Sequence, residues 1–342
     1  MHIVNSVLGE AGGGRWQVVC DYNRLLVDHG HRVLLLLGRR HLPDVGALPS
    51  GVEVRVVDSH GHYDYPAAWR LRRSLSAFRP RIALAHCSRS VALLRRALPS
   101  GTPLLAVSHS AKVRRLVPAD ACVALNRAIR ERFERISGGK PCYVVPNGIS
   151  VDASRPPGPR RSGRPPNIAA LGRFDPVKGF DVFVEALGML GRDGRIFRAV
   201  LGGAGARQQA LENRVAALDL SDRVTFPGWV ADVDHFFATA DVLCVPARSD
   251  AFGLTPLQAA AAGVPLVLST AEGHRDMFEP EVEALYAGVG DIGRTAAQIA
   301  RILDDPGLAE RLRQAAFRKV ASHYSTAAAG EKIIEAIEQT IK

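Results

Sequence analysis

Short apolar runs alternate with segments of helical periodicity along the first half of the chain. The run HIVNSV at residues 2–7 predicts a strand, and a glycine turn, Gly12 to Gly14, follows it. The next segment, Trp16 to His29, repeats apolar residues every three to four positions and predicts a helix that ends at Gly30. Further strand-like runs lie at residues 31–37, 52–58, 81–87 and 103–109. Repeated strand–helix–strand units are typical of a parallel sheet covered on both faces by helices.

The alternation stops at residues 154–166, a stretch of proline, glycine and arginine that cannot form a core element. It then restarts with predicted helices at 180–190 and 208–218 and strands at 167–173, 198–205, 223–229, 240–246 and 265–270. A length of 342 residues also favours two domains. We expect an N-terminal Rossmann-like domain at 1–153, a linker at 154–166, a C-terminal Rossmann-like domain at 167–326, and an amphipathic helix at 327–342 that packs back toward the N-terminal domain.

Doubly wound parallel sheets bind ligands at the carboxyl ends of their strands, where the strand order reverses. We expect the two sheets to present these ends to one interdomain cleft. The loops nominated by this rule follow Val7, Val107, Leu171, Leu201, Val245 and Leu268.

Cysteine usage and the length of the apolar runs indicate a cytoplasmic protein. The five cysteines show no Cys-x-x-Cys spacing, which argues against a disulfide framework and a zinc knuckle. The first residues, MHIVNSVLGE, lack a basic region followed by an apolar core, so we expect no secretory signal. The longest apolar runs are too short to cross a bilayer. We therefore expect a soluble protein, either free in the cytoplasm or peripheral on the inner face of its membrane.

The net charge of +10 is concentrated in the first half of the chain. Residues 1–165 hold 26 Lys and Arg against 11 Asp and Glu, whereas the remainder holds 18 against 23. This asymmetry predicts that the first half meets an anionic partner: a lipid surface, a phosphorylated acceptor or nucleic acid. A basic amphipathic helix predicted at 66–81 could either pack normally with a solvated face or dock on anionic lipid.

Three segments carry candidate chemistry. The glycine turn lets backbone N–H groups approach an anion, although it is not a G-x-G-x-x-G fingerprint. The segment LGRFDPVKGFD, Leu171 to Asp181, places Arg173 and Lys178 around one turn, where both cations can reach a diphosphate. In the segment from Pro246 to Thr270, a loop containing Asp250 leads into a helix that begins near Thr255.

In their order and spacing these segments resemble the family 4 retaining glycosyltransferases, which have the GT-B fold. The similarity extends over the glycine turn, Ser108-His109, VVPNGISVD (144–152), GRFDPVKGFD, LGGAG (201–205), VTFPGWV, ADVLCVPARSDAFGL and AAGVPLVLST. It implies an α/β protein of two Rossmann-like doubly wound domains. It further implies transfer of a sugar from a nucleotide sugar, UDP before GDP or ADP, to a glycan, lipid-linked or phosphorylated acceptor in cell-envelope or glycoconjugate synthesis.

The resemblance also implies site residues. His109, Arg173, Lys178 and Asp250 would be catalytic: the histidine near the anomeric carbon, the two cations at the leaving diphosphate and the aspartate at the donor sugar. The donor would be bound by Gly13, Gly14, Gly172, Arg173, Lys178, Gly203, Asp250, Ala251, Phe252, Gly253, Leu254, Thr255 and Gln258. We expect no cofactor, and no metal because Arg173 and Lys178 already neutralise the diphosphate. Departing diphosphate oxygens accept the proton of the acceptor, and no carboxylate acts as nucleophile.

The chain departs from the family where Glu-x7-Glu is usual, because Asp250 and Gln258 occupy those positions. Glutamine accepts from one ribose hydroxyl but without the charge of a carboxylate, so donor identity and affinity are affected.

Several alternatives stay open on sequence alone. A sugar-nucleotide epimerase or a sucrose-phosphate-type transferase would share the fold, and a non-enzymatic protein that binds nucleic acid or membrane surfaces would share the charge. We expect no nucleic-acid partner, because no recognition motif is present. Other weak patterns are an NADP site at Arg39-Arg40 and a metal site at Asp232-x-Asp234, where we favour a helix N-cap. The remaining two are His86, expected to be satisfied by backbone, and Ser108-His109-Ser110, rejected as a hydrolase triad.

Overall fold

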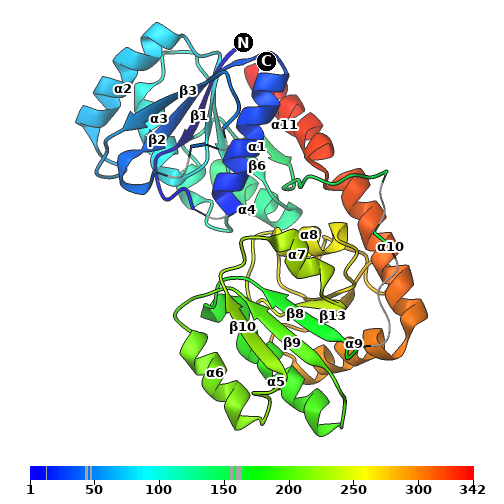
Figure 1. Ribbon diagram of the computed structural model, residues 1–342. Coiled ribbons are helices and arrows are strands. Elements are labelled where there is room, and N and C mark those ends of the chain that lie inside the picture. Colours follow the sequence, from blue (N-terminus) through cyan, green and yellow to red (C-terminus); the bar gives the residue numbers. More distant parts are fainter. Residues whose placement is uncertain (13, 43–44, 47, 155–156, 159–163) are drawn as a thin grey trace. The chain divides into compact units, whose positions relative to one another are not determined.

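The structure, a computed structural model, describes residues 1–12, 14–42, 45–46, 48–154, 157–158 and 164–342 (Figure 1). The chain divides into two compact units: unit 1 comprises Met1–Gly148 and Thr326–Lys342, and unit 2 comprises Ile149–Ser325. Much of the predicted linker at 154–166 lies outside the described residues. Unit 2 begins before the boundary expected at 153, because Ile149 pairs with Ser325 and its N–H donates to the Tyr324 carbonyl (2.9 Å).

Unit 1 is built on a parallel sheet of seven strands in the order β3-β2-β1-β4-β5-β6-β7. The order reverses between β1 and β4, which makes the loops after these strands the natural ligand site. The strands are β1 (His2–Val7), β2 (Arg32–Gly38), β3 (Val52–Val57), β4 (Ile82–Ala85), β5 (Leu104–Val107), β6 (Ala121–Ala124) and β7 (Cys142–Val144). The helices are α1 (Gly14–Asp28), α2 (Tyr65–Phe78), α3 (Ser88–Ala97), α4 (Arg127–Ser137) and α11 (Thr326–Ile341), with short 3-10 turns at Arg39–His41 and Arg114–Leu116.

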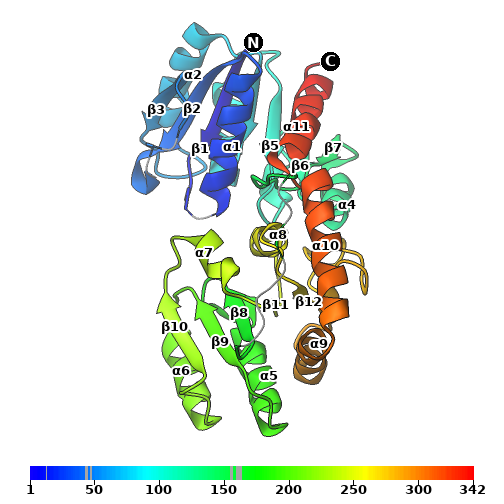
Figure 2. The ribbon, with the colours of Figure 1, turned by 45° about the vertical axis from the view of Figure 1, so that its right-hand side comes forward.

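The C-terminal helix α11 completes the core of unit 1. Ile333, Ala336 and Ile337 of this helix belong to the same buried cluster as Ile3 of β1 and Leu26 of α1. In both ribbon views α11, drawn in red, runs beside α1 (Figures 1 and 2). The last helix of the chain therefore packs in the unit formed by the first 148 residues.

The basic helix predicted at 66–81 is observed as α2. Its apolar stripe, Leu71, Leu75 and Phe78, is buried, which confirms the predicted amphipathic face. Asp64 caps the helix by accepting a hydrogen bond from the Ala67 N–H (2.9 Å).

Unit 2 repeats the architecture with a parallel sheet of six strands in the order β10-β9-β8-β11-β12-β13, reversing between β8 and β11. The strands are β8 (Asn167–Leu171), β9 (Arg198–Gly202), β10 (Val224–Gly228), β11 (Val242–Val245), β12 (Leu266–Ser269) and β13 (Leu285–Ala287). The helices are α5 (Phe180–Arg192), α6 (Gln208–Ala217), α7 (Val233–Ala238), α8 (Thr255–Ala261), α9 (Ile292–Asp304) and α10 (Pro306–His323), with a 3-10 turn at Pro176–Lys178. Two parallel doubly wound sheets confirm the predicted fold class. Within the described ranges, no helix has the length and apolarity that crossing a bilayer requires.

Candidate active site

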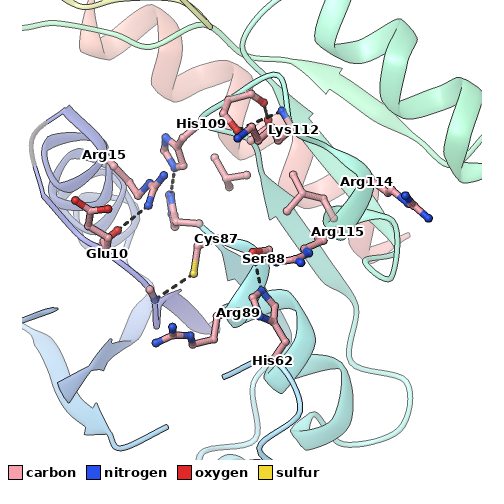
Figure 3. Close-up of a pocket in the computed structure, with 16 residues that line it drawn as sticks. Glu10, Arg15, His62, Cys87, Ser88, Arg89, His109, Lys112, Arg114 and Arg115 are labelled. Carbon is pink, nitrogen blue, oxygen red and sulfur yellow. Dashed lines mark hydrogen bonds between the residues drawn. The ribbon is translucent and has the colours of Figure 1, made fainter. Parts of the chain in front are cut away.

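A cavity of about 580 Å³ opens in unit 1 at the carboxyl ends of β1, β4 and β5. Its walls come from the loop after β1, the start of α1, the loop after β4 and the segment from Val107 to Leu116 (Figure 3). We call it the histidine cavity, because His86 and His109 lie together in its wall. This is the position that the reversal of strand order nominates for a ligand.

The two histidines form one hydrogen-bonded unit. His86 Nδ1 lies 2.9 Å from His109 Nε2, and the rings are stacked with centroids 5.1 Å apart. The expectation that backbone satisfies the His86 side chain is therefore wrong. The sequence gave no sign of the partner, because the pairing depends on the neighbouring ends of β4 and β5.

Both histidines are neutral near pH 7. Although His109 keeps an edge exposed to the cavity, loss of solvation lowers its pKa to about 3, and the charge of Arg15 acts in the same direction. Burial likewise lowers the pKa of His86 well below its usual value, and the neighbouring His109 and Arg15 add to the effect. His86 Nε2 is buried and has no hydrogen-bond partner among the described residues. A buried Nε2 without a proton costs less free energy than a buried N–H without an acceptor, so we assign the His86 proton to Nδ1. His86 Nδ1 then donates to His109 Nε2, and His109 carries its own proton on Nδ1.

Cationic side chains surround this pair. Arg15 points toward His109 from α1, and its guanidinium donates to the Glu10 carbonyl (2.7 Å) (Figure 3). Lys112 and Arg115 also line the cavity. None of these cations belongs to a motif, and only the charge excess of the first half of the chain hinted at them.

The glycine turn is only partly described. Gly14 opens α1, whereas Gly13 lies outside the described residues. Its expected role in donor binding stays a prediction.

In unit 2 the structure brings Lys178 and Asp250 into direct contact. The Lys178 ammonium donates to Asp250 Oδ2 at 2.6 Å, and the two side chains are 28% and 14% exposed. The shielding of this pair from solvent distinguishes it from the many surface pairs of the molecule, which contribute little.

Two close contacts position the pair. Gly179 follows Lys178 with φ +69, and a Cβ there would lie 2.1 Å from the Pro246 carbonyl oxygen, so only glycine fits. The Arg248 backbone N–H donates to the Val177 carbonyl (2.7 Å). The Arg248 guanidinium donates to both carboxylate oxygens of Asp181, each at 2.7 Å. The Lys178 turn is thereby clamped to the loop after β11.

Asp250 is ionised. Burial acts to raise its pKa, but His274 and the charge of Lys178 outweigh burial and hold the pKa below its usual range. His274 Nε2 lies 3.7 Å from Asp250 Oδ2, beyond a normal hydrogen bond, and has no other partner in the part of the chain that the structure describes. His274 was missed from sequence. Its position in the loop after β12 was the available signal.

Arg173 lies apart from this pair. Its side chain is 71% exposed, and its Nε donates to Asp175 Oδ2 at 2.6 Å. No described contact joins it to Lys178, so its expected role at a diphosphate stays a prediction.

The remaining predicted donor residues of unit 2 follow β8 and β9 or lie in the segment that leads into α8. Gly172 and Gly203 donate their N–H groups to the carbonyls of Gly202 (3.0 Å) and Gly228 (2.8 Å). A Cβ on Gly203 would lie 1.9 Å from the Gly172 carbonyl oxygen, so these glycines permit close approach of two strand ends. Phe252 is buried edge-on against Tyr324 (5.8 Å) and fixes the loop, while Ala251, Gly253, Leu254, Thr255 and Gln258 are partly exposed.

Asp232 is a helix N-cap, as the sequence indicated. Its Oδ1 accepts from the His235 N–H at 2.8 Å at the start of α7. Over the residues that the structure describes, no group of three His, Cys, Asp or Glu side chains could hold a metal ion.

Comparison with known proteins identifies relatives for both units. Residues 12–153 match the family model "Glycosyltransferase Family 4", and residues 155–319 match "Glycosyl transferases group 1". A D-inositol 3-phosphate glycosyltransferase of Xylanimonas cellulosilytica is 30% identical over 289 residues, covering 78% of this chain and 67% of that protein. A GDP-mannose-dependent phosphatidylinositol monomannoside mannosyltransferase of Mycobacterium tuberculosis is 28% identical, covering 81% and 75%.

Other relatives are matched over a smaller part. The alpha-D-kanosaminyltransferase of Streptomyces kanamyceticus is 28% identical over 49% of this chain, and the chain spans 44% of its length. Among solved structures, a sucrose-phosphate synthase from Thermosynechococcus elongatus superposes with a TM-score of 0.85 at 20% identity, covering 99% of this chain and 98% of that one. Anabaena Alr3699/HepE in complex with UDP superposes with a TM-score of 0.82 at 18% identity, covering 99% of both chains. These structures share the GT-B fold and confirm it for this chain.

Proposed function

Because the chain belongs to the family 4 glycosyltransferases, we propose that it transfers a sugar from a nucleoside diphosphate sugar to a glycan, lipid-linked or phosphorylated acceptor, with retention and without a metal ion. UDP is the favoured nucleotide. The proposal rests chiefly on the Lys178–Asp250 pair, which fixes a cation at the carboxyl end of the second sheet. The named relatives are transferases, which favours transfer over epimerisation.

On the donor side, Lys178 stabilises the diphosphate as it leaves. Asp250 and the Gly179 turn hold the ammonium in place before substrate binds, so no reorganisation is required when charge develops. Arg173 is exposed and reaches the same anion by leaving its pair with Asp175. Gln258 at the start of α8 accepts from a ribose hydroxyl, and Gly253 to Thr255 supply backbone N–H groups to the sugar.

For the transferred sugar itself, we assign His109 a contact near the anomeric carbon. The transition state of such a transfer resembles an oxocarbenium ion and carries positive charge on the ring. With a pKa of about 3, His109 is neutral at pH 7 and hydrogen-bonds the sugar without repelling that charge. His86 holds the ring of His109 in orientation and fixes which nitrogen is protonated.

The acceptor hydroxyl attacks from the face that the diphosphate leaves. Its proton passes to a departing phosphate oxygen, the sugar–phosphate bond breaks and the new glycosidic bond forms on the same face. The chain supplies electrostatic stabilisation and orientation. We place this reaction in cell-envelope glycan synthesis, with the enzyme cytoplasmic or peripheral at the membrane.

A panel of UDP-, GDP- and ADP-sugars tests the proposal. Thermal shift identifies the bound donor, and mass spectrometry then detects donor-dependent glycosylation of acceptors, with NMR reporting the anomeric configuration of the product. Activity should persist in excess EDTA. Loss of activity in EDTA that Mn²⁺ restores would contradict the metal-free mechanism, and an inverted product would contradict retention.

A further inference from the structure

A second cavity of unit 1, of about 610 Å³, adjoins the histidine cavity. The two cavities share His62, Ser88, Arg114 and Arg115 as lining residues. We call the second cavity the arginine pocket, because Arg95, Arg96, Arg114 and Arg115 line it together with Tyr63 and His62. None of the described lining residues is acidic, so the pocket is strongly positive, and its volume suits a small ligand.

Two of the four arginines are held by the protein itself. The Arg95 guanidinium donates to both carboxylate oxygens of Asp120 at 3.1 and 3.2 Å. Arg96 donates to the His62 carbonyl (3.1 Å) and lies over the ring of Tyr65, 5.1 Å from its centroid. These two arginines therefore build the wall of the pocket.

Arg114 and Arg115 are placed differently. They are consecutive residues of a 3-10 turn, and the apolar side chains on either side of the two arginines, Val113 and Leu116, are buried. Across the described ranges, no ion pair involves either guanidinium. Both side chains are exposed and line the arginine pocket, so their charge is available to an anion in it.

The charge of Arg115 faces the shared wall of the two cavities. His62 and Arg115 line both cavities, and burial lowers the pKa of His62, with the charges of Arg115 and Arg89 acting in the same direction. Figure 3 shows Arg115 reaching toward Ser88 and His62, whereas Arg114 points away from them. Ser88 Oγ is hydrogen-bonded to His62 Nε2 at 2.9 Å, so a hydroxyl lies at the same point.

We propose that the arginine pocket binds a phosphate group of the acceptor, with Arg115 as its main ligand and Arg114 as a supporting charge. A guanidinium presents two parallel N–H donors that match phosphate oxygens. Tyr63, 76% exposed at the pocket, covers the sugar or polyol that carries the phosphate. The proposal rests on the proposed function in one respect: the acceptor hydroxyl lies in the adjoining histidine cavity, so acceptor hydroxyl and phosphate occupy neighbouring cavities. The acceptor is thus a phosphorylated sugar or polyol, either free or as a phospholipid headgroup.

Binding measurements on the intact chain test the site without any transfer reaction. Calorimetry with glucose 6-phosphate, inositol 1-phosphate and inorganic phosphate, each compared with its unphosphorylated counterpart where one exists, should show binding that requires the phosphate. The double variant Arg114→Ala/Arg115→Ala should weaken it at least about tenfold, as expected for the loss of a charge-assisted hydrogen bond. Arg72→Ala is the matched control, because Arg72 is an exposed cation of α2 outside both cavities.

Two further arms separate the sources of the phosphate and the two proposals. Lys178→Ala should retain sugar-phosphate binding, which excludes the donor site as its location. Sedimentation with phosphatidylglycerol vesicles, lost in the double variant but kept in Arg72→Ala, would assign the phosphate to a lipid headgroup. Equal binding of all probes and vesicles by the double variant and the wild type would overturn the proposal, as would no binding of either kind. Phosphate binding without any nucleotide-sugar transfer would instead refute the proposed function and leave the site intact.

Discussion

Removal of the Lys178 ammonium should lower both the stability of the fold and the rate of catalysis. In Lys178→Ala the Asp250 carboxylate keeps its buried position but loses the cation that lies 2.6 Å away. A hydrogen bond to a charged group contributes about 1.5–3 kcal/mol, and breaking a fully buried pair costs about 3–5 kcal/mol. Because Lys178 is 28% exposed, we expect the free energy of unfolding to fall by about 2 kcal/mol.

The substitution should also raise the activation free energy of transfer by a similar amount, for an independent reason. A cation that acts on the leaving diphosphate is needed most in the transition state, and losing one such group lowers kcat by roughly 10²-fold or more. Arg173→Ala should behave similarly in turnover but leave stability unchanged, because its pair with Asp175 is exposed.

The double variant Lys178→Met/Asp250→Asn distinguishes the two effects. It removes both charges together, so urea unfolding should recover most of the lost stability, whereas kcat should remain low. Arg248→Ala is the control for the loop itself, since it breaks the exposed clamp to Asp181 without touching the pair. If kcat is near normal in Lys178→Ala and Arg173→Ala, this loop has no part in the mechanism.

The stability effect has a definite pH dependence. The folded pKa of Asp250 lies below its unfolded value of about 3.8, so the pair stabilises the protein above that pH and ceases to do so as the pH falls through the folded pKa. In Lys178→Ala burial acts on Asp250 without the opposing ammonium. The difference in unfolding free energy between wild type and variant should therefore be full at pH 7. It should decrease as the pH falls through the folded pKa of Asp250 in the variant and disappear below that of the wild type.

Two other substitutions test separate parts of the site. Gln258→Glu should tighten binding of both the nucleoside diphosphate and the sugar donor several-fold, because a charge-assisted bond to ribose replaces a neutral one; an equal gain with a 2′,3′-dideoxynucleotide would disprove ribose contact. His86→Ala should lower kcat roughly tenfold by releasing the ring of His109. Nucleotide affinity measured by calorimetry should stay unchanged, and a proportional loss of both would indicate general damage to the fold.

The alternation of apolar runs was sufficient to predict most of both sheets. It failed for β6, β7 and β13, which have four, three and three residues. The two three-residue strands contain too few positions for a period to show, and β6, with the sequence ACVA, is half alanine, which is depleted in strands. Their existence depends on neighbouring strands that supply hydrogen bonds.

In the candidate site, contacts between near neighbours in sequence were predictable, whereas contacts between distant positions were not. Asp232 was predictable as an N-cap, because capping depends on residues three apart. The Lys178–Asp250 and His86–His109 contacts join positions 72 and 23 residues apart, and no local pattern encodes such pairing. The family resemblance nominated three of these four residues, but it did not indicate that they contact each other in pairs.

The return of α11 to unit 1 has a consequence for the order in which the protein acquires structure during synthesis. The residues Ile333, Ala336 and Ile337 leave the ribosome only after all of unit 2, residues 149–325, has been made. At a synthesis rate of about 5–20 residues per second, the first 148 residues remain without the helix that completes their core for roughly ten seconds or longer. Unit 2 is continuous in sequence and can fold first. Ribosome-arrested chains should accordingly show protease resistance in residues 149–325 before residues 1–148, and the opposite order would mean that unit 1 is stable without its last helix.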